Sequence, residues 1–244
     1  MTKPHWRERL ISSVPIPALT LLGLGLITQV LWHAARPGPQ AQAQALPVPP
    51  AFEYIHLLSL GDPEVLGKLL MLWLQAFDNQ PGVSIPFWKL DYPRVIGWLE
   101  RILELDPRGQ YPLLAASRLY GEVPDKVKQR QMLEFVYKQF FYDPNRRWPW
   151  LTHAVYIAKH RLHDLPLALR YAQAISAYAT GKEVPHWAQQ MQIFVLEDMG
   201  ETESARVLIG GLLEGGTITD SHELRFLLSR LNKLKDLEVN PSRR

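Results

Sequence analysis

Hydrophobic and polar positions follow two different patterns along this chain. From Leu10 to Ala35 there is no Asp, Glu, Lys or Arg, and the segment is almost wholly apolar. Beyond residue 51 the apolar residues instead recur at intervals of three and four, as they do at Val95, Trp98, Leu99, Ile102 and Leu105. That period is typical of amphipathic helices. The pattern therefore predicts one apolar N-terminal helix followed by a series of amphipathic helices.

The apolar N-terminal segment has the length of a membrane span. About 20 helical residues cross roughly 30 Å of hydrocarbon, and residues 11–35 supply that length. A cleaved signal peptide is the alternative, because the N-terminus is basic and small residues follow at Ala41–Ala45. The apolar core exceeds the 7 to 15 residues typical of a signal peptide, and those alanines lie beyond Arg36. We therefore predict that residues 11–35 form a retained transmembrane signal-anchor helix.

The basic residues around this segment predict its orientation. Lys3, Arg7 and Arg9 precede the span, and only Arg36 follows it within the next fifteen residues. The positive-inside rule then predicts a cytoplasmic tail at residues 1–10, with the bulk of the chain outside the cytoplasm. The chain has no cysteine and no permitted N-x-S/T sequon. We expect a single-pass protein of the bacterial inner membrane whose larger part is periplasmic.

The remainder of the chain divides by composition. Residues 36–50 contain five prolines among small and polar residues, which predicts a semi-extended linker. From residue 51 to 236, helix-sized blocks are separated by short breakers such as Gly61-Asp62-Pro63 and Asp143-Pro144, and no sustained period of two occurs. We expect an all-α domain over residues 51–236 and a basic tail over residues 237–244.

Internal repeats narrow the choice among all-α folds. The segment DPRGQYPLL begins at Asp106, and the similar segment DPNRRWPWL begins at Asp143, 37 residues later. The same interval separates Trp150 from Trp187. Because a single helical hairpin cannot bury its own apolar face, hairpins that repeat at this period stack on one another.

These segments resemble the tetratricopeptide repeat (TPR) family. The segment 95–107 looks like the second helix of a TPR unit with its closing proline, and segments 161–175 and 198–213 resemble the family's turn and second helix. Ala168 and Ala205 occupy the close-packing position. The resemblance covers most of residues 52–213, with repeats of about 37 residues where the family usually has 34. It implies a TPR-like α-solenoid of helical hairpins with a concave groove.

The resemblance also implies which residues contact a ligand. In the family, the inner face of each first helix lines the groove, and aromatic and arginine side chains are common anchors of binding surfaces. The groove positions implied in this chain are Arg108, Tyr111, Arg118, Trp150, His153, Ile157, His160, Trp187 and Gln190.

No motif in the sequence identifies a reaction. His153 and His160 are seven residues apart, roughly 10 Å along a helix, which is too far for both rings to bind one ion easily. We therefore predict no metal and no cofactor, with His163 as a surface histidine near them. The chain has no G-x-S-x-G, phosphate-loop or H-E-x-x-H motif. Nothing singles out a general acid among the carboxylates, which include Glu53, Glu100, Glu104, Glu197 and Asp198.

The net charge of the chain says little about the class of its binding partner. Lys and Arg number 27 and Asp and Glu 24, so the net charge of +3 is too small to suggest a nucleic-acid binder. Basic residues do gather after a helix start at Asp220 or Ser221, where they suit a polar capping helix. Contact with anionic headgroups or an acidic partner is the alternative for that helix.

Together these features predict a membrane-anchored, non-enzymatic TPR-like adaptor or scaffold. It would bind a protein or peptide on the extracytoplasmic side, in the assembly of an envelope complex. Two other functions remain open. One is an accessory subunit held in a membrane complex through its transmembrane helix, where Gly23 and Gly25 would allow close packing. The other is a helical cell-wall or glycan hydrolase.

Overall fold

A computed structural model of the protein describes residues 14–35, 43–215, 218 and 220–239. Over these residues the chain is mostly helical, in agreement with the predicted all-α class, and it contains one two-stranded ladder. The chain divides into two compact units, residues 1–42 and 43–244. The predicted cytoplasmic tail at residues 1–10 and the end of the basic tail, residues 240–244, lie outside the described residues.

The first unit contains the apolar helix α1 (Ile16–Ala35). It is long and apolar enough to cross a membrane, and none of its residues is buried. Pro17 lies in its first turn, where a missing N–H costs a helix no hydrogen bond. In water, a fully exposed apolar helix of this length would be unfavourable, whereas in hydrocarbon its internal hydrogen bonds satisfy the backbone.

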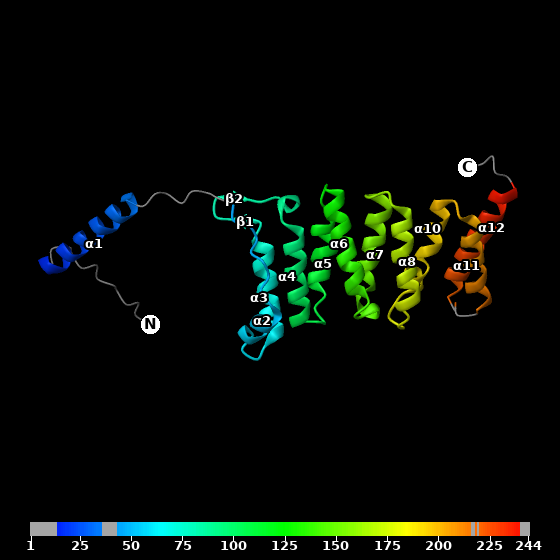
Figure 1. The fold of residues 1–244 in the computed structure, drawn as a ribbon, viewed down its shortest axis with the longest axis horizontal. Helices are drawn as coiled ribbons and strands as arrows, with labels where there is room; N and C mark the ends of the chain where they lie inside the picture. The colour runs from blue at the N-terminus through cyan, green and yellow to red at the C-terminus, as the bar shows by residue number, and fades with distance from the viewer. Residues whose placement is uncertain (1–13, 36–42, 216–217, 219, 240–244) are drawn as a thin grey trace, which may run out of the picture. The chain divides into compact units, whose positions relative to one another are not determined.

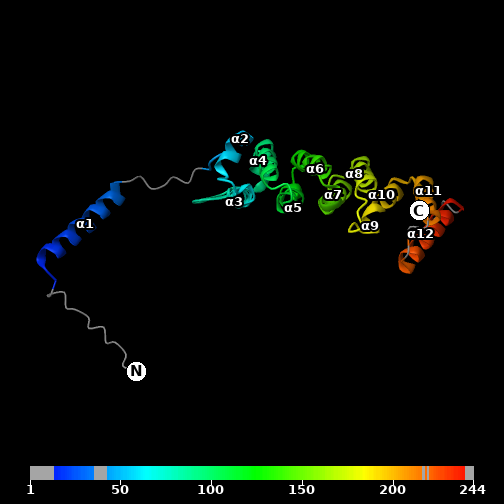
Figure 2. The same cartoon turned by 90° about the horizontal axis from the view of Figure 1, so that it is seen from below.

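The second unit consists of consecutive helices that lie side by side (Figure 1). Viewed from below, α3, α5, α7, α10 and α12 form one row and α4, α6, α8 and α11 form the other (Figure 2). The helices are α2 (Phe52–Leu58), α3 (Pro63–Ala76), α4 (Tyr92–Leu105), α5 (Tyr111–Arg118), α6 (Lys126–Phe140), α7 (Pro144–His160), α8 (Leu165–Tyr178), α9 (His186–Gln189), α10 (Met191–Met199), α11 (Thr202–Glu214) and α12 (Ser221–Val239). Between α3 and α4, the irregular loop contains the strands β1 (Asn79–Gln80) and β2 (Val83–Ser84) and a 3-10 turn, η2 (Phe87–Lys89). A second 3-10 turn, η3 (Tyr120–Glu122), follows α5.

Aspartates begin several of these helices. Asp62, Asp91, Asp125 and Asp164 each accept a hydrogen bond from a backbone N–H of the first turn, at 2.9 to 3.2 Å. Such N-caps satisfy backbone donors that have no partner within the helix. Helix α12 likewise begins at the predicted point, because the Asp220 carboxylate accepts from the N–H of His222 at 2.8 Å.

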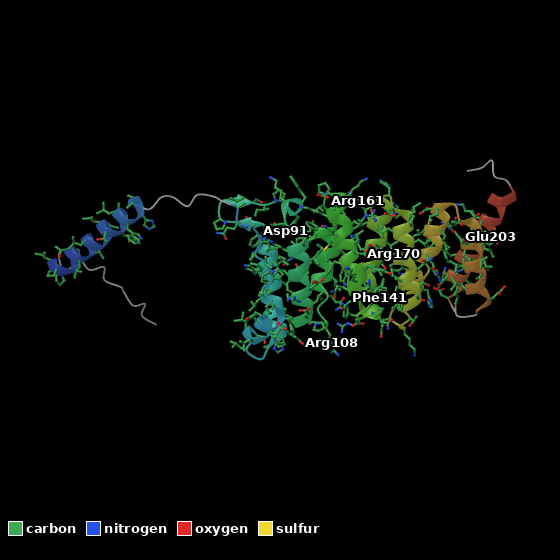
Figure 3. The ribbon with its side chains drawn as sticks, in the orientation of Figure 1. Asp91, Arg108, Phe141, Arg161, Arg170 and Glu203 are labelled. Atoms are coloured by element: carbon green, nitrogen blue, oxygen red, sulfur yellow. The ribbon has the colours of Figure 1, made fainter. Side chains whose placement is uncertain are left out.

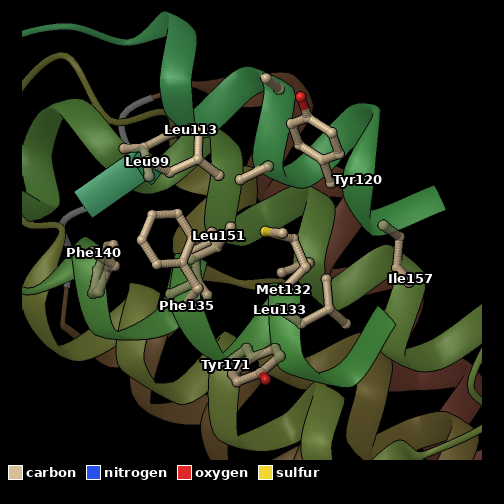
Figure 4. Packing of buried hydrophobic residues seen from close by; sticks show 14 of the residues in the cluster. Leu99, Leu113, Tyr120, Met132, Leu133, Phe135, Phe140, Leu151, Ile157 and Tyr171 are labelled. Carbon is tan, nitrogen blue, oxygen red and sulfur yellow. The ribbon is translucent and has the colours of Figure 1, made fainter. Parts of the chain in front are cut away.

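The hydrophobic core lies between the two rows. Side chains from α4 to α8 interlock there, including Leu99, Phe135, Leu151 and Tyr171 (Figure 4). A smaller cluster joins α10, α11 and α12. Ala168 and Ala205, at the predicted close-packing positions, are both fully buried. Small residues at these points let neighbouring helices approach closely.

The folded unit begins before the predicted boundary at residue 51. Arg94 Nη1 donates to the carbonyl of Leu46 at 2.5 Å, and Trp98 Nε1 donates to that of Pro47 at 2.8 Å. Leu46 itself is buried, and Arg101 Nε donates to the carbonyl of Pro50 at 3.1 Å. Residues 46–50 therefore lie along α4. The carbonyls of this proline-rich segment are not used in a helix or a sheet, so they can accept hydrogen bonds from side chains of α4. At the other end, α12 runs to Val239, past the predicted boundary at residue 236.

Candidate functional site

The row that contains α5, α7, α9 and α10 presents most of the predicted ligand-contacting aromatic residues. We call the side chains on its outer surface the aromatic face. Three of them are about half exposed: Tyr111 (48%), Tyr156 (48%) and Trp187 (53%). The face also includes Arg118, Trp148, Trp150, His153 and His160. Exposed aromatic side chains on rigid helices offer large contact area at little cost in conformational entropy.

A stack of three rings forms the centre of the aromatic face, on α7. The rings of His153 and Tyr156 are 5.9 Å apart, and those of Tyr156 and His160 are 4.8 Å apart. Their spacing of three and four residues places them on one side of the helix. Tyr156 is not among the predicted groove residues, although its spacing of three and four from the two histidines was the signal for it. Ile157, which was selected, is fully buried and belongs to the core.

Charged residues surround the first ring of this stack. His153 Nε2 and Glu122 Oε1 are 2.9 Å apart, and the other Glu122 oxygen lies 4.0 Å from Arg161 Nη2. Burial lowers the pKa of His153, the hydrogen bond with Glu122 opposes that shift, and the nearby charge of Arg118 adds to it. The ring is therefore neutral at neutral pH and serves as a hydrogen-bonding, stacking surface.

Replacing His153 with Gln is expected to reduce the pH dependence of stability. A lowered histidine pKa means that the unfolded chain binds more protons than the folded one below pH of about 6.5. The wild-type free energy of unfolding should then fall as the pH drops below that value, and it should fall less in His153→Gln. Urea unfolding between neutral and mildly acidic pH measures this difference. Equal slopes in the wild-type protein and the variant would contradict the prediction.

The remaining aromatic residues connect neighbouring helices along the same face. Trp150 Nε1 donates to Gln110 Oε1 at 2.7 Å, next to Tyr111 at the start of α5. On the other side of α7, the rings of Trp148 and Trp187 meet edge to face at 5.5 Å. Aromatic residues of α7 therefore contact the helices on both sides of it, at the start of α5 and at α9.

Besides Ile157, Gln190 is a predicted groove residue that does not belong to this face. Gln190 is buried, and its side-chain amide donates to Glu223 Oε1 of α12 at 2.5 Å, so it holds two helices together. Arg108 is exposed in the loop before α5, at the opposite end of the helices from Arg161 (Figure 3). The structure thus separates Arg108 from the cluster of Arg118, Glu122 and His153.

A mostly apolar pocket adjoins the aromatic face between α3 and α5. It has a volume of about 370 Å³, and its lining includes Gly67, Met71, Leu72, Ile102 and Tyr111. The Tyr111 hydroxyl accepts a hydrogen bond from Gln75 Nε2 at 2.5 Å, which fixes the ring at the rim. The pocket is large enough for one or two apolar side chains of a partner.

Three of the five candidate acids form ion pairs. Glu104 pairs with Arg101 at 2.7 Å, Glu197 Oε2 lies 2.8 Å from Arg230 Nε, and Asp198 pairs with Lys159. Within the described residues, no group of three or more His, Asp or Glu side chains is placed to hold a metal ion. The Glu104 pair lies within α4, whereas Glu197 connects α10 to α12 and Asp198 connects α10 to α7.

No protein-family model, curated protein or solved structure matches this chain. The grounds for assigning a function are therefore the aromatic face, the packing of the helices and the apolar helix α1.

Proposed function

We propose that this protein is a membrane-anchored, TPR-like adaptor that binds a segment of another protein along the aromatic face. The observation that carries the proposal is the half-exposure of Tyr111, Tyr156 and Trp187 on one continuous row of helices. Binding would be an equilibrium docking event in which no bond is made. Its place would be the periplasmic side of a bacterial inner membrane, in the assembly of an envelope complex.

Contacts at the repeat spacing support an α-solenoid. Side-chain hydrogen bonds join residues 34, 36 and 40 positions apart, in the pairs Arg130 with Asp164, Gly181 with Asn145, and Trp150 with Gln110. Each pair connects one helical hairpin to the next. Such nearest-neighbour contacts are what stacked repeats require, and they build an extended surface that suits a peptide ligand.

Helix α1 and the charges before it support the proposed anchoring. The 20 residues of α1 carry no Asp, Glu, Lys or Arg, and its side chains are exposed along nearly all of its length. Three basic residues precede it in the sequence, which favours a cytoplasmic N-terminus. The aromatic face would then be displayed on the periplasmic side.

The chemistry of the face indicates the kind of segment that it would bind. Aromatic rings and the apolar pocket beside Tyr111 favour apolar side chains, which would supply most of the affinity. Arg118 and Arg161 add positive charge against the single carboxylate of Glu122. We therefore propose an apolar segment with at least one acidic residue as the ligand.

Site-specific photo-crosslinking in intact cells tests this proposal. A photoreactive amino acid replaces Tyr156 or Trp187 on the aromatic face, and Tyr178 on α8 serves as the control. Tyr178 is a matched position because it is an aromatic residue that is 56% exposed but lies on the other row of helices. We expect the same partner in adducts from positions 156 and 187 and its absence from adducts of position 178.

Crosslinking in alanine variants provides a second test of the same proposal. The double change Tyr156→Ala with Trp187→Ala should abolish crosslinking from position 111, while Tyr178→Ala should preserve it. A partner captured equally from both rows, or from neither, would contradict binding at the aromatic face.

A further inference from the structure

The N-terminal end of the row of helices carries an uncovered apolar surface. We call it the apolar end patch, and its members come from the α2–α3 hairpin. Three leucines at the tip are highly exposed, at 76%, 67% and 95%, and two residues of α3 are exposed at 49% and 57%. In order, these are Leu57, Leu58, Leu60, Val65 and Leu69. Contiguous patches of this kind on a soluble surface usually mark an interaction site.

The turn at the tip of this hairpin holds a leucine in a disfavoured conformation. Leu60 has a φ of +50°, in the left-handed region that favours glycine, and its neighbour Gly61 has a φ of +93°. The Leu60 side chain is 95% exposed, so it gains nothing by packing within the protein. Asparagine or glycine would satisfy this turn at lower cost. We therefore expect the Leu60 side chain to contact an apolar surface outside the domain.

The length of free chain limits how far the folded unit can move from the membrane when α1 spans it. Residues 46–50 are bound to α4, and Gln44 exchanges two hydrogen bonds with the side chain of Gln80. Only residues 36–42 then separate the end of α1 from the first residue of the folded unit. Eight Cα-to-Cα steps reach at most about 30 Å. Figure 1 shows that the chain enters the folded unit beside β1, at the opposite end of α3 from the tip of the hairpin. The 14 residues of α3 span about 20 Å, so both points lie within reach of one membrane surface.

We propose that the apolar end patch docks onto the surface of the phospholipid bilayer in which α1 is anchored. The leucines at the tip would enter the boundary between headgroups and acyl chains, as the apolar side of an interfacial helix does. Tyr54, which is 69% exposed on α2, would lie at headgroup depth, where tyrosine is enriched. This inference rests on the proposed anchoring by α1, and it adds a fixed orientation of the aromatic face relative to the membrane.

The charges around the patch indicate which lipid property it recognises. Glu53, Asp62 and Glu64 accompany a single Lys68 over α2 and α3. Anionic headgroups attract clusters of basic residues, and this end of the domain has none. Docking should therefore depend on apolar insertion, occur on zwitterionic phosphatidylcholine, and persist at high salt.

Fluorescence quenching by lipid-borne nitroxides tests the docking in the full-length protein. The natural chain has no cysteine, so Leu60→Cys, Val207→Cys and Leu24→Cys each carry one thiol for an environment-sensitive dye. The proteins are reconstituted into phosphatidylcholine vesicles with or without acyl-chain nitroxides. Val207 is the matched control, because it is 63% exposed on α11 near the other end of the row. Leu24 reports on α1, where it is also 63% exposed.

The expected result is strong quenching of the dyes at positions 60 and 24 and little at position 207. We expect the nitroxides to reduce the signal at position 60 at least about twofold, since an inserted tip lies within the reach of acyl-chain probes. Quenching at position 24 without quenching at position 60 would overturn the docking and leave the anchoring intact. Absence of quenching at both positions would overturn both. A dye at position 60 that is shielded only at high protein-to-lipid ratios would identify a second copy as the occupant and would also overturn the proposal.

Discussion

Replacing Phe140 with Ala is expected to lower the free energy of unfolding by about 3–5 kcal/mol. Phe140 ends α6 and is fully buried, with Phe141 packed against its ring at 5.3 Å. Truncation removes a large apolar side chain from the centre of the core and leaves a cavity that rigid neighbouring helices cannot close. Equilibrium urea unfolding followed by circular dichroism measures the loss.

The adjacent residue provides the matched control. Phe141 is 41% exposed and contacts the rings of Tyr137 and Tyr178 at 5.0 and 5.2 Å. Its truncation removes only edge contacts, so Phe141→Ala should cost about 1 kcal/mol. Equal losses of unfolding free energy at the two positions would contradict the burial of Phe140 in the core.

Replacing Arg147 with Met is expected to destabilise the protein by about 3 kcal/mol although the two side chains have similar length. The Arg147 side chain is buried, and its guanidinium donates to the carbonyl of Gln139 at 2.6 Å and to that of Pro107 at 2.8 Å. Burial lowers its pKa. Methionine would take the donor away from the Pro107 carbonyl and leave the Gln139 carbonyl with only the N–H of Tyr142, at 3.3 Å. A partly buried acceptor that loses its donor retains its desolvation penalty. Urea unfolding of the variant measures the change.

Two further variants separate this effect from the general loss of an arginine. Arg146 is exposed, and Arg146→Met should change stability by about 0.5 kcal/mol or less. Arg147→Lys keeps the charge but replaces the planar fork with a single ammonium, so it should recover only part of the loss. Full recovery by lysine would indicate that charge, and not the two directed hydrogen bonds, holds this position.

The sequence by itself determined most of the local structure. Helix starts follow from aspartates such as Asp62 and Asp164, because their side chains cap the first turn wherever the neighbouring helices lie. The length of α1 follows from the absence of charge between Leu10 and Ala35. Period-three and period-four apolar positions predicted which side of α4 is buried, since helix geometry alone sets that side.

Tertiary structure decided which polar and proline-rich segments are buried. Gln190 has the spacing of a surface residue, yet α12 packs over it and accepts its hydrogen bond. Residues 46–50 have the composition of a linker, yet donors on α4 hold them against the domain. Both outcomes depend on partners more than 30 residues away, which no local pattern encodes.

Both the sequence and the tertiary structure determine the aromatic face. The resemblance to TPR repeats implied Tyr111, Trp150 and Trp187 as ligand-contacting positions. The structure brings Trp150 to Gln110, next to Tyr111, and Trp187 to Trp148. The structure also adds Tyr156 to the exposed positions and removes Ile157 from them. The helices packed on either side of α7 decide which of its sides faces the core. The sequence determined the helices and their spacing, while packing between neighbours determined which side chains remain available to a partner. The physical reason is that a helix fixes relative positions along itself, whereas burial is a property of two or more helices in contact.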